Sequence, residues 1–164
     1  MSATMSVREN IAGWLAAFNA KDLDALKSFY DPESSYANAA APMYHGIDAI
    51  MGWYEQAFAT VTGTLHFREE FLIEEGSMAL LVGKYYFAPP SGDPAGAENA
   101  TGRVALVYRR APDDRWLLLF DMDNTPPDVG PGDFDVRPAT DAWPGRGAAG
   151  DRPAQGAQHT ETSG

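Results

Sequence analysis

The spacing of apolar residues changes near residue 60, and this change most limits the folds open to the chain. Before it, Val7, Ile11 and Trp14 recur at three- and four-residue intervals, which is the spacing of one helix face. Across residues 62–124 apolar and polar residues alternate, as in strands with one buried face. Helices followed by a run of long strands are typical of an α+β domain.

Three helices are predicted in the first 60 residues. Ser6 and Glu9 form a capping box at the start of the first helix. A short second helix begins at Asp22 and is predicted to end at Pro32, because proline cannot continue a helix. A short extended piece follows. The third helix opens at Gly46 and places on one face Ile47, Ile50, Tyr54 and Phe58.

Four strands are predicted after the helices. In the first, which runs from residue 62 to a turn at 75–77, alternation places Leu65, Phe67, Phe71 and Ile73 on one face. The others span 78–87, 101–110 and 116–124, with a Pro- and Gly-rich loop at 89–98. A strongly curved antiparallel sheet wrapped on helices leaves a cavity at its mouth.

Composition divides the chain into a domain at 1–126 and a tail at 127–164. The tail holds 5 Pro and 7 Gly and few large apolar side chains. Such a segment buries too little surface to offset its chain entropy. Phe134 and Trp143 are the aromatic residues that could dock on the domain.

Charge and composition exclude several classes of function. A formal net charge of −11 argues against a nucleic-acid or anionic-membrane partner, because phosphate binding requires clustered Lys and Arg. The absence of cysteine excludes disulfides, thiolate nucleophiles and cysteine-based metal sites. No signal peptide or membrane-spanning stretch is recognised, so a cytoplasmic location is the expectation.

Two acidic residues are predicted to lie on apolar strand faces. Glu69 shares a face with Phe67 and Phe71, which predicts either a pocket acid or base or an outward rotation at a bulge. A salt bridge to Arg68 or Arg103 is a further alternative. In the last strand Leu117 and Leu119 precede Asp121 and Asp123 on one face, with Trp116, Leu118, Phe120 and Met122 on the other. Asp121 is therefore a general base or hydrogen-bond acceptor, or it lies at a solvated strand end.

Tyr36 and Asn38 stand two apart in the extended piece, so they share a face. They could orient a water or polarise a carbonyl. Alternatively, the tyrosine is a core residue and the asparagine holds the following loop. His45 and His66 have no partner at metal-ligand spacing, so no metal and no cofactor are predicted.

Several short stretches resemble the NTF2-like superfamily, specifically its SnoaL-like and ketosteroid-isomerase-like members. They are "YDPESSYAN", "YHGIDAI" and "RWLLLFDMDN", and the likeness covers about residues 6–125. The resemblance implies a cone-shaped fold, with three N-terminal helices packed on a strongly curved antiparallel sheet and one deep pocket. It also implies a homodimer formed through the outer sheet face. Members include polyketide cyclases, isomerases, epoxide hydrolases and binding domains without catalysis.

The stretch "YANAAAPMYHGIDAI" is similar to a segment of limonene-epoxide-hydrolase-like enzymes. There a Tyr and an Asn hold the attacking water, and they would correspond to Tyr36 and Asn38; the strand aspartate would correspond to Asp121. Those enzymes also use an Arg-x-Asp pair on the middle strand, where this chain has Val82 and Lys84.

The leading hypothesis is a cofactor-free isomerase or cyclase acting on a hydrophobic polyketide- or terpenoid-like molecule. Asp121, Tyr36, Asn38 and Glu69 are the predicted catalytic residues. The predicted pocket residues are Met43, Tyr44, Trp53, Tyr54, His66, Lys84, Arg103 and Asp123. Two alternatives remain open: water addition to an epoxide, and a non-catalytic ligand-binding or oligomerisation module. A polyketide or terpenoid could also react mainly because the pocket folds it into a reactive shape.

Overall fold

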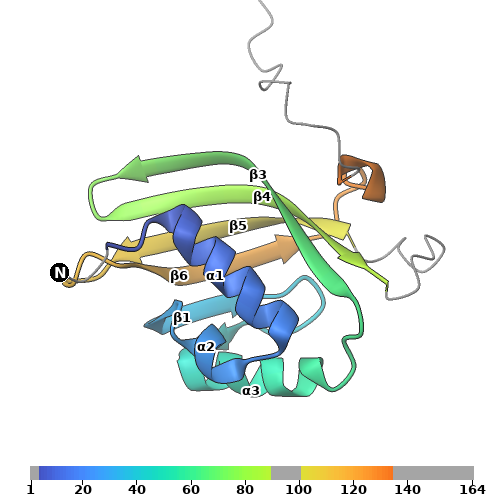
Figure 1. The fold of residues 1–164 in the computed structure, drawn as a ribbon, viewed down its shortest axis with the longest axis horizontal. Helices are drawn as coiled ribbons and strands as arrows, with labels where there is room; N and C mark the ends of the chain where they lie inside the picture. Colours follow the sequence, from blue (N-terminus) through green and yellow to red (C-terminus); the bar gives the residue numbers. More distant parts are fainter. Residues whose placement is uncertain (1–3, 90–100, 135–164) are drawn as a thin grey trace, which may run out of the picture.

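The computed structural model describes residues 4–89 and 101–134, which form one sheet and three α-helices (Figure 1). The helices are α1 (Val7–Ala20), α2 (Leu23–Lys27) and α3 (Ile47–Phe58). The strands are β1 (Tyr30–Ala37), β2 (Tyr44–His45), β3 (Thr64–Glu75), β4 (Met78–Ala88), β5 (Thr101–Arg110) and β6 (Trp116–Asn124). The predicted α+β class is therefore confirmed.

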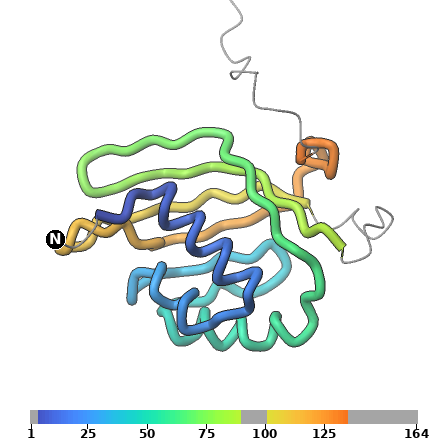
Figure 2. Tube along the Cα trace, in the orientation of Figure 1, coloured from blue at the N-terminus to red at the C-terminus, as the bar shows by residue number. Residues whose placement is uncertain are grey.

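The sheet has the order β2-β1-β6-β5-β4-β3, and it is mixed rather than wholly antiparallel. β3 to β6 form the predicted antiparallel meander, whereas β1 pairs with β6 in parallel. β1 and β2 also precede α3, so the prediction that all three helices come before the sheet is wrong in this detail. α1 lies across one face of the curved sheet, and α3 lies beside β1 (Figures 1 and 2).

Local sequence accounts for the helix ends. The Ser6–Glu9 capping box is present at the start of α1, as predicted. α3 starts after Gly46, whose φ of 81° favours glycine. Pro32 does not end α2, which stops earlier; it lies inside β1. Because proline has no N–H to donate, its position fits the interval between Tyr30 and Ser35 where the pairing of β1 with β6 is irregular.

A β-bulge in β3 changes which residues face the core. Glu69 pairs with Gly83 and Phe71 with Val82, so Glu70 is the extra residue. The extra residue reverses the alternation, so side chains in the second half of the strand point to the opposite face from the one predicted. Leu65 and Phe67 face the helices, but Phe71 and Ile73 are exposed on the outer face. The prediction that these four residues share one face is therefore wrong.

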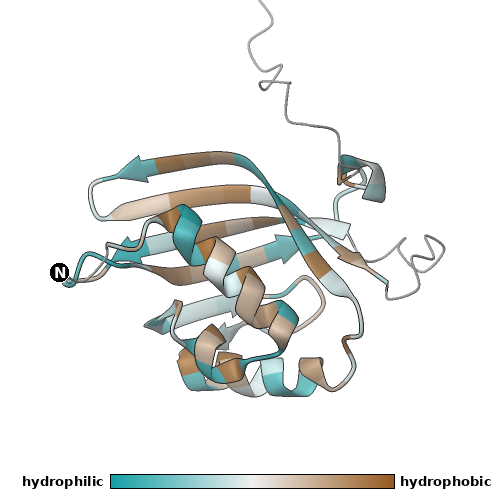
Figure 3. Cartoon of the chain, viewed as in Figure 1, coloured by the Kyte–Doolittle hydropathy of each residue, from teal (hydrophilic) through white to brown (hydrophobic). Residues whose placement is uncertain are grey.

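The core lies between the helices and the inner face of the sheet. Its fully buried members include Leu26, Ile50, Leu81 and Tyr108. Figure 3 shows hydrophobic stretches in β3 and β4 near the turn that joins them, and in the middle of β5. No helix in residues 4–89 and 101–134 is long and apolar enough to cross a membrane.

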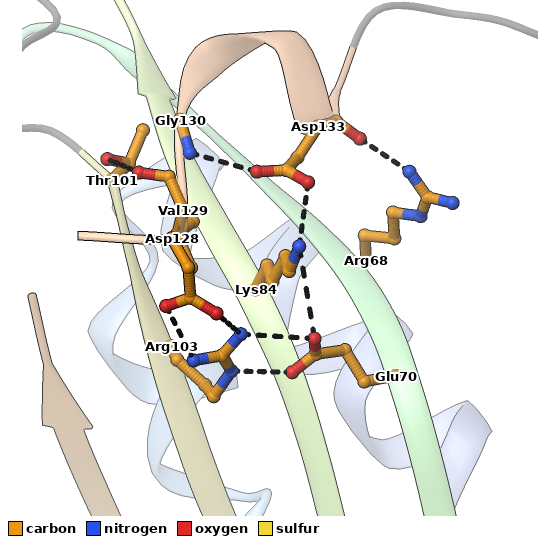
Figure 4. Close-up of polar contacts among 9 residues, drawn as sticks. All are labelled: Arg68, Glu70, Lys84, Thr101, Arg103, Asp128, Val129, Gly130 and Asp133. Atoms are coloured by element: carbon orange, nitrogen blue, oxygen red, sulfur yellow. Dashed lines mark hydrogen bonds and ion pairs between the residues drawn. The ribbon is translucent and has the colours of Figure 1, made fainter. Parts of the chain in front are cut away.

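The segment 127–134, which composition assigns to the tail, is held against the sheet. Val129 is buried, and its carbonyl accepts a bond from Thr101. Asp128 pairs with Arg103, and Asp133 pairs with Lys84 (Figure 4). Composition does not reveal this contact, because ion pairs and one buried valine hold the segment in place. The remaining tail with Trp143, and loop residues 90–98, lie outside the described residues.

Candidate active site

A cavity of about 400 Å³ lies between the helices and the inner face of the sheet. Most of its wall is aromatic or aliphatic, and its carboxyl groups come from β6 and its one amide from Asn38, just after β1. The lining residues are Ile11, Trp14, Leu15, Phe18, Tyr36, Asn38, Trp53, Tyr54, Ala57, Thr60, Val61, Leu65, Phe67, Tyr85, Phe87, Val104, Leu106, Leu118, Asp121 and Asp123. A mostly apolar cavity with a few converging polar groups is typical of a small-molecule site.

Tyr36 and Asn38 form a hydrogen-bonded pair in the cavity wall. The amide nitrogen of Asn38 donates to the Tyr36 hydroxyl at 2.7 Å, and that hydroxyl donates to Asp123 at 3.2 Å. The other Asp123 carboxylate oxygen accepts the Ala39 N–H at 2.9 Å. Burial raises the pKa of Tyr36, so this hydroxyl keeps its proton and remains a donor.

Asp121 reaches the cavity because β6 carries a bulge of its own. Val107 pairs with Phe120 and Tyr108 with Leu118, so Leu119 is the extra residue. Leu118 and Asp121 therefore both line the cavity, whereas the predicted face joined Asp121 to Leu117 and Leu119. The register places Asp121 opposite Tyr36 of β1.

The Asp121 carboxyl is buried and lacks a hydrogen-bond partner on one oxygen. It is 5% exposed, and no described residue bonds to its Oδ1 atom. Burial raises the pKa of Asp121 to about 8, with a smaller contribution from the charge of Asp123. The carboxyl is therefore mostly protonated at neutral pH and can both give and take a proton in that range.

The carboxyl groups of Asp121 and Asp123 differ in the hydrogen bonds that they accept. Asp123 accepts two hydrogen bonds, whereas none is present at Oδ1 of Asp121. Burial raises the pKa of Asp123 above its ordinary value as well, but its two hydrogen bonds offset part of this rise. Pairs of titratable groups in contrasting environments often mark acid and base positions. Of the two carboxyl groups, Asp121 is the one with an oxygen that no described residue bonds.

Comparison with known families identifies the relatives of this fold. The SnoaL-like domain model matches residues 11–118. The chain belongs to the SnoaL-like domain family. A comparison with curated proteins found no match.

Solved structures show that this SnoaL-like chain has the NTF2-like fold, with a curved mixed sheet and three helices. An NTF2-like protein with a cystatin-like fold from Novosphingobium aromaticivorans is 18% identical with a TM-score of 0.64, covering 75% of this chain and 81% of that one. A ketosteroid isomerase-like protein from Erwinia carotovora atroseptica is 15% identical with a TM-score of 0.59, covering 75% and 96%. A putative calcium/calmodulin-dependent protein kinase type II association domain from Thiobacillus denitrificans is 14% identical with a TM-score of 0.66, covering 77% and 99%.

Glu69 does not line the cavity of the SnoaL-like chain. It lies on the inner side of β3, and its carboxylate accepts two bonds from Arg8 of α1, at 2.7 and 2.9 Å. The predicted salt-bridge partners, Arg68 and Arg103, bond elsewhere. The Arg8 side chain lowers the pKa of Glu69, so this residue is an ionised link between α1 and the sheet.

The other predicted pocket residues divide into two groups. Trp53 and Tyr54 of α3 line the cavity, together with Asp123. The other predicted pocket residues do not line the cavity. Tyr44 packs behind the wall with its ring centroid 6.2 Å from that of Trp53. Lys84 and Arg103 belong to the ion-pair cluster that holds segment 127–134 (Figure 4), and Met43 and His66 are exposed.

Several wall residues were not predicted as such. Trp14 and Phe18 of α1 face the cavity, as do Tyr85 and Phe87 of β4. Their spacing predicts only a buried face, and a cavity and a filled core produce the same periodicity. Among the described residues, no group of three His, Cys, Asp or Glu side chains could hold a metal ion.

Proposed function

We propose that this SnoaL-like chain is a cofactor-free isomerase or cyclase that acts on a neutral polyketide- or terpenoid-like molecule. One observation carries the proposal: the Asp121 carboxyl, unpartnered at Oδ1, lies at the polar end of an apolar cavity, opposite Tyr36. The family includes isomerases and cyclases, and a ketosteroid isomerase-like protein has the same fold, which supports this class of reaction.

The reaction consists of proton transfers at carbon. The ionised Asp121 carboxylate removes a proton from a carbon next to a carbonyl, and the C–H electron pair becomes an enolate. For isomerisation, Asp121 returns the proton to another carbon of the conjugated system. For cyclisation, the enolate carbon attacks a second carbonyl in the same molecule, whose oxygen then takes the proton. Asn38 and Tyr36 hold polar groups of the substrate near Asp121.

The wall composition defines the substrate class. Among the described lining residues there is no Lys, Arg or His, whereas there are two aspartates. An anionic molecule would therefore lose its hydration without gaining a counter-charge. The wall around Trp53, Tyr36 and Tyr54 has ring centroids 4.9 to 6.0 Å apart, which provides flat faces for an unsaturated ring system. These walls would also hold a flexible chain in a reactive conformation.

The two alternatives are less well supported. A binding or oligomerisation module agrees with the fold that this chain shares with a putative association domain. Such a module would be favoured if apolar side chains filled the cavity. Instead, the polar side chains of Tyr36, Asn38 and Asp121 line an open space. For epoxide hydrolysis, Lys84, which stands where the similar enzymes have part of their Arg-x-Asp pair, lies in an ion pair outside the cavity.

The experiment is exchange of the α-hydrogens of 1-tetralone, a flat neutral ketone, for deuterium in D₂O. We expect the wild-type protein to accelerate the exchange, measured by mass spectrometry, because Asp121 can remove an α-proton. Glu69→Gln is the matched control, because Glu69 lies on the inner side of β3 but does not line the cavity. This variant should leave the exchange rate unchanged. Absence of catalysed exchange, or equal loss in Asp121→Asn and in Glu69→Gln, would contradict the proposal.

We also propose that two copies of the chain pair through the outer face of the sheet. Cross-strand register places two apolar rows there, Phe71–Val82–Ala105–Met122 and Ile73–Leu80–Val107–Phe120. Phe71, Ile73 and Met122 are between 42% and 55% exposed in the single chain. Contiguous exposed apolar surface of this kind marks an interface.

Sedimentation equilibrium tests the pairing. The wild-type protein should sediment as a dimer, and Ile73→Glu should shift it to monomer because a carboxylate would be buried in the contact. Met43→Glu is the control, because Met43 is equally exposed but lies in the loop before β2. A monomeric wild-type protein, or a dimeric Ile73→Glu variant, would be inconsistent with this interface.

A further inference from the structure

Two glycines of the sheet lie beneath two aromatic rings of the cavity wall. Gly83 of β4 and Gly102 of β5 do not line the cavity themselves, whereas Phe67 and Tyr85 do. A Cβ atom added at Gly83 would overlap Cε2 and Cζ of the Phe67 ring, and one added at Gly102 would overlap Cζ and the hydroxyl oxygen of Tyr85. Each overlap is far closer than the ~3.5 Å of an ordinary carbon contact. The two rings, here called the shelf, therefore occupy space that any other residue would fill with its own side chain.

The strand register places the shelf at a distance from Asp121 along the sheet. Tyr85 pairs with Phe67 of β3 on one side and with Gly102 of β5 on the other, so the three form one row across the sheet. Leu81, four residues before Tyr85, belongs to the row that reaches Asp121 of β6. Since a strand rises about 3.3 Å per residue, the two rows are roughly 13 Å apart. One cavity is lined by both the shelf and Asp121, so it extends over this length.

The helix side of the cavity has no room to move away from the shelf. Phe18 of α1 is buried and lines the cavity. Its ring lies among those of Trp14, Phe58 and Phe87, with centroids 5.2 to 5.7 Å away. Because close-packed rings transmit a displacement instead of absorbing it, a shelf that rose from the sheet would narrow the cavity.

We infer that Gly83 and Gly102 determine the length of molecule that the cavity accepts. With glycine at both positions the shelf lies low against the sheet, and the space above it holds the apolar end of a molecule whose reacting carbon is at Asp121. A larger side chain at either position would lift the shelf into that space. The inference rests on the proposed function only for the placement of the reacting carbon, and it adds the residues that select substrates by length.

The test compares two ketones that share one reacting group but differ in length. 1-Tetralone is the short probe, and 6-phenyl-1-tetralone extends it by one ring along its long axis. Isothermal titration calorimetry measures the Kd of each. The wild-type protein should bind the longer ketone at least about tenfold more tightly, because the added ring is buried on the shelf. Gly83→Ala and Gly102→Ala should each raise the Kd of the longer ketone about tenfold and change that of 1-tetralone by less than about twofold.

Two further variants separate selection by length from a general effect on folding. A Cβ atom at Gly83 would also lie 2.7 Å from the backbone oxygen of Arg68, so the alanine variants press on neighbouring strands as well as on the shelf. Phe67→Leu keeps both glycines and removes one ring of the shelf, and it should weaken binding of the longer ketone only. Gly52→Ala in α3 is the matched control, because nothing lies within 4 Å of the added Cβ, and it should leave both Kd values unchanged.

Deuterium exchange of the same two ketones distinguishes this inference from the proposed function. Equal affinities of the wild-type protein for the two ketones would overturn the inference alone. Equal weakening of both ketones by folded alanine variants or by Phe67→Leu would do the same. A glycine-dependent preference for the longer ketone without catalysed exchange of either would overturn the proposed function alone. No binding of either ketone by the folded wild-type protein would overturn both.

Discussion

Replacing Asp121 with asparagine is expected to lower catalysed exchange about 10³-fold while making the protein more stable. The amide fills the same space but can no longer take up the proton. Removal of the carboxyl also removes a charge that the fold buries at a cost. Loss of activity together with gain of stability distinguishes a functional group from a structural one.

The gain in stability should depend on pH in a defined direction. Burial raises the pKa of Asp121 from 3.8 in the unfolded chain to about 8 in the folded protein. Below the lower value both states hold the proton, so the carboxyl has no effect on stability. As the pH rises toward 8 the unfolded chain ionises first, and the wild-type protein loses stability progressively. Above 8 the loss is complete and constant.

Thermal unfolding of the two proteins measures this difference. Near pH 8 the asparagine variant should be more stable by on the order of 4 kcal/mol, or roughly 10 °C in Tm. The two melting curves should converge near pH 4. A variant that melts below the wild-type protein at pH 8 would show that the Asp121 charge is compensated in the folded state.

Asn10→Asp is expected to have the largest effect on folding. Asn10 is fully buried on α1, and its amide nitrogen donates to two backbone carbonyls, Phe29 at 3.0 Å and Trp116 at 2.8 Å. An aspartate would place an ionised oxygen against these two acceptors. Stability should fall by on the order of 4 kcal/mol at neutral pH.

Denaturant unfolding at two pH values tests this prediction. Burial beside two carbonyls disfavours ionisation of the substituted carboxyl in the folded state, so the loss should grow as the pH rises above about 4. Asn19→Asp is the matched control: Asn19 lies on the same helix and bonds the backbone of Leu65, but it is exposed. Its cost should be about 1 kcal/mol. Equal costs at the two positions would contradict the role given to Asn10.

Sequence patterns predicted the elements well because the fold follows apolar spacing. The strands at 101–110 and 116–124 match the predicted bounds, and α1 begins at its capping box. The pairing of β1 with β6 in parallel depends on contacts far apart in the sequence, which periodicity does not encode. The bulges at Glu70 and Leu119 are equally hidden, because alternation continues on both sides of each extra residue.

The candidate site was predictable only in part, for a related reason. Asp121 was identified because an acid on an apolar strand face is unusual. Tyr36 and Asn38 were identified by their two-residue spacing, and the structure brings them to the same cavity as Asp121. Glu69 met the same criterion as Asp121 but bonds Arg8, 61 residues away. A single strand pattern does not show which acid has a partner.

The proposed acid–base chemistry rests on an exchangeable proton that the Asp121 carboxyl holds inside the cavity. NMR of the protein with ¹³C-labelled aspartate carboxyls, assigned with the Asp121→Asn variant, follows this group directly as the pH is changed. We predict a titration midpoint near 8, well above the ordinary aspartate value of 3.8. A midpoint near 3.8 would show that Asp121 is an ordinary ionised carboxylate that holds no proton at neutral pH, and it would contradict the protonated state given to this group.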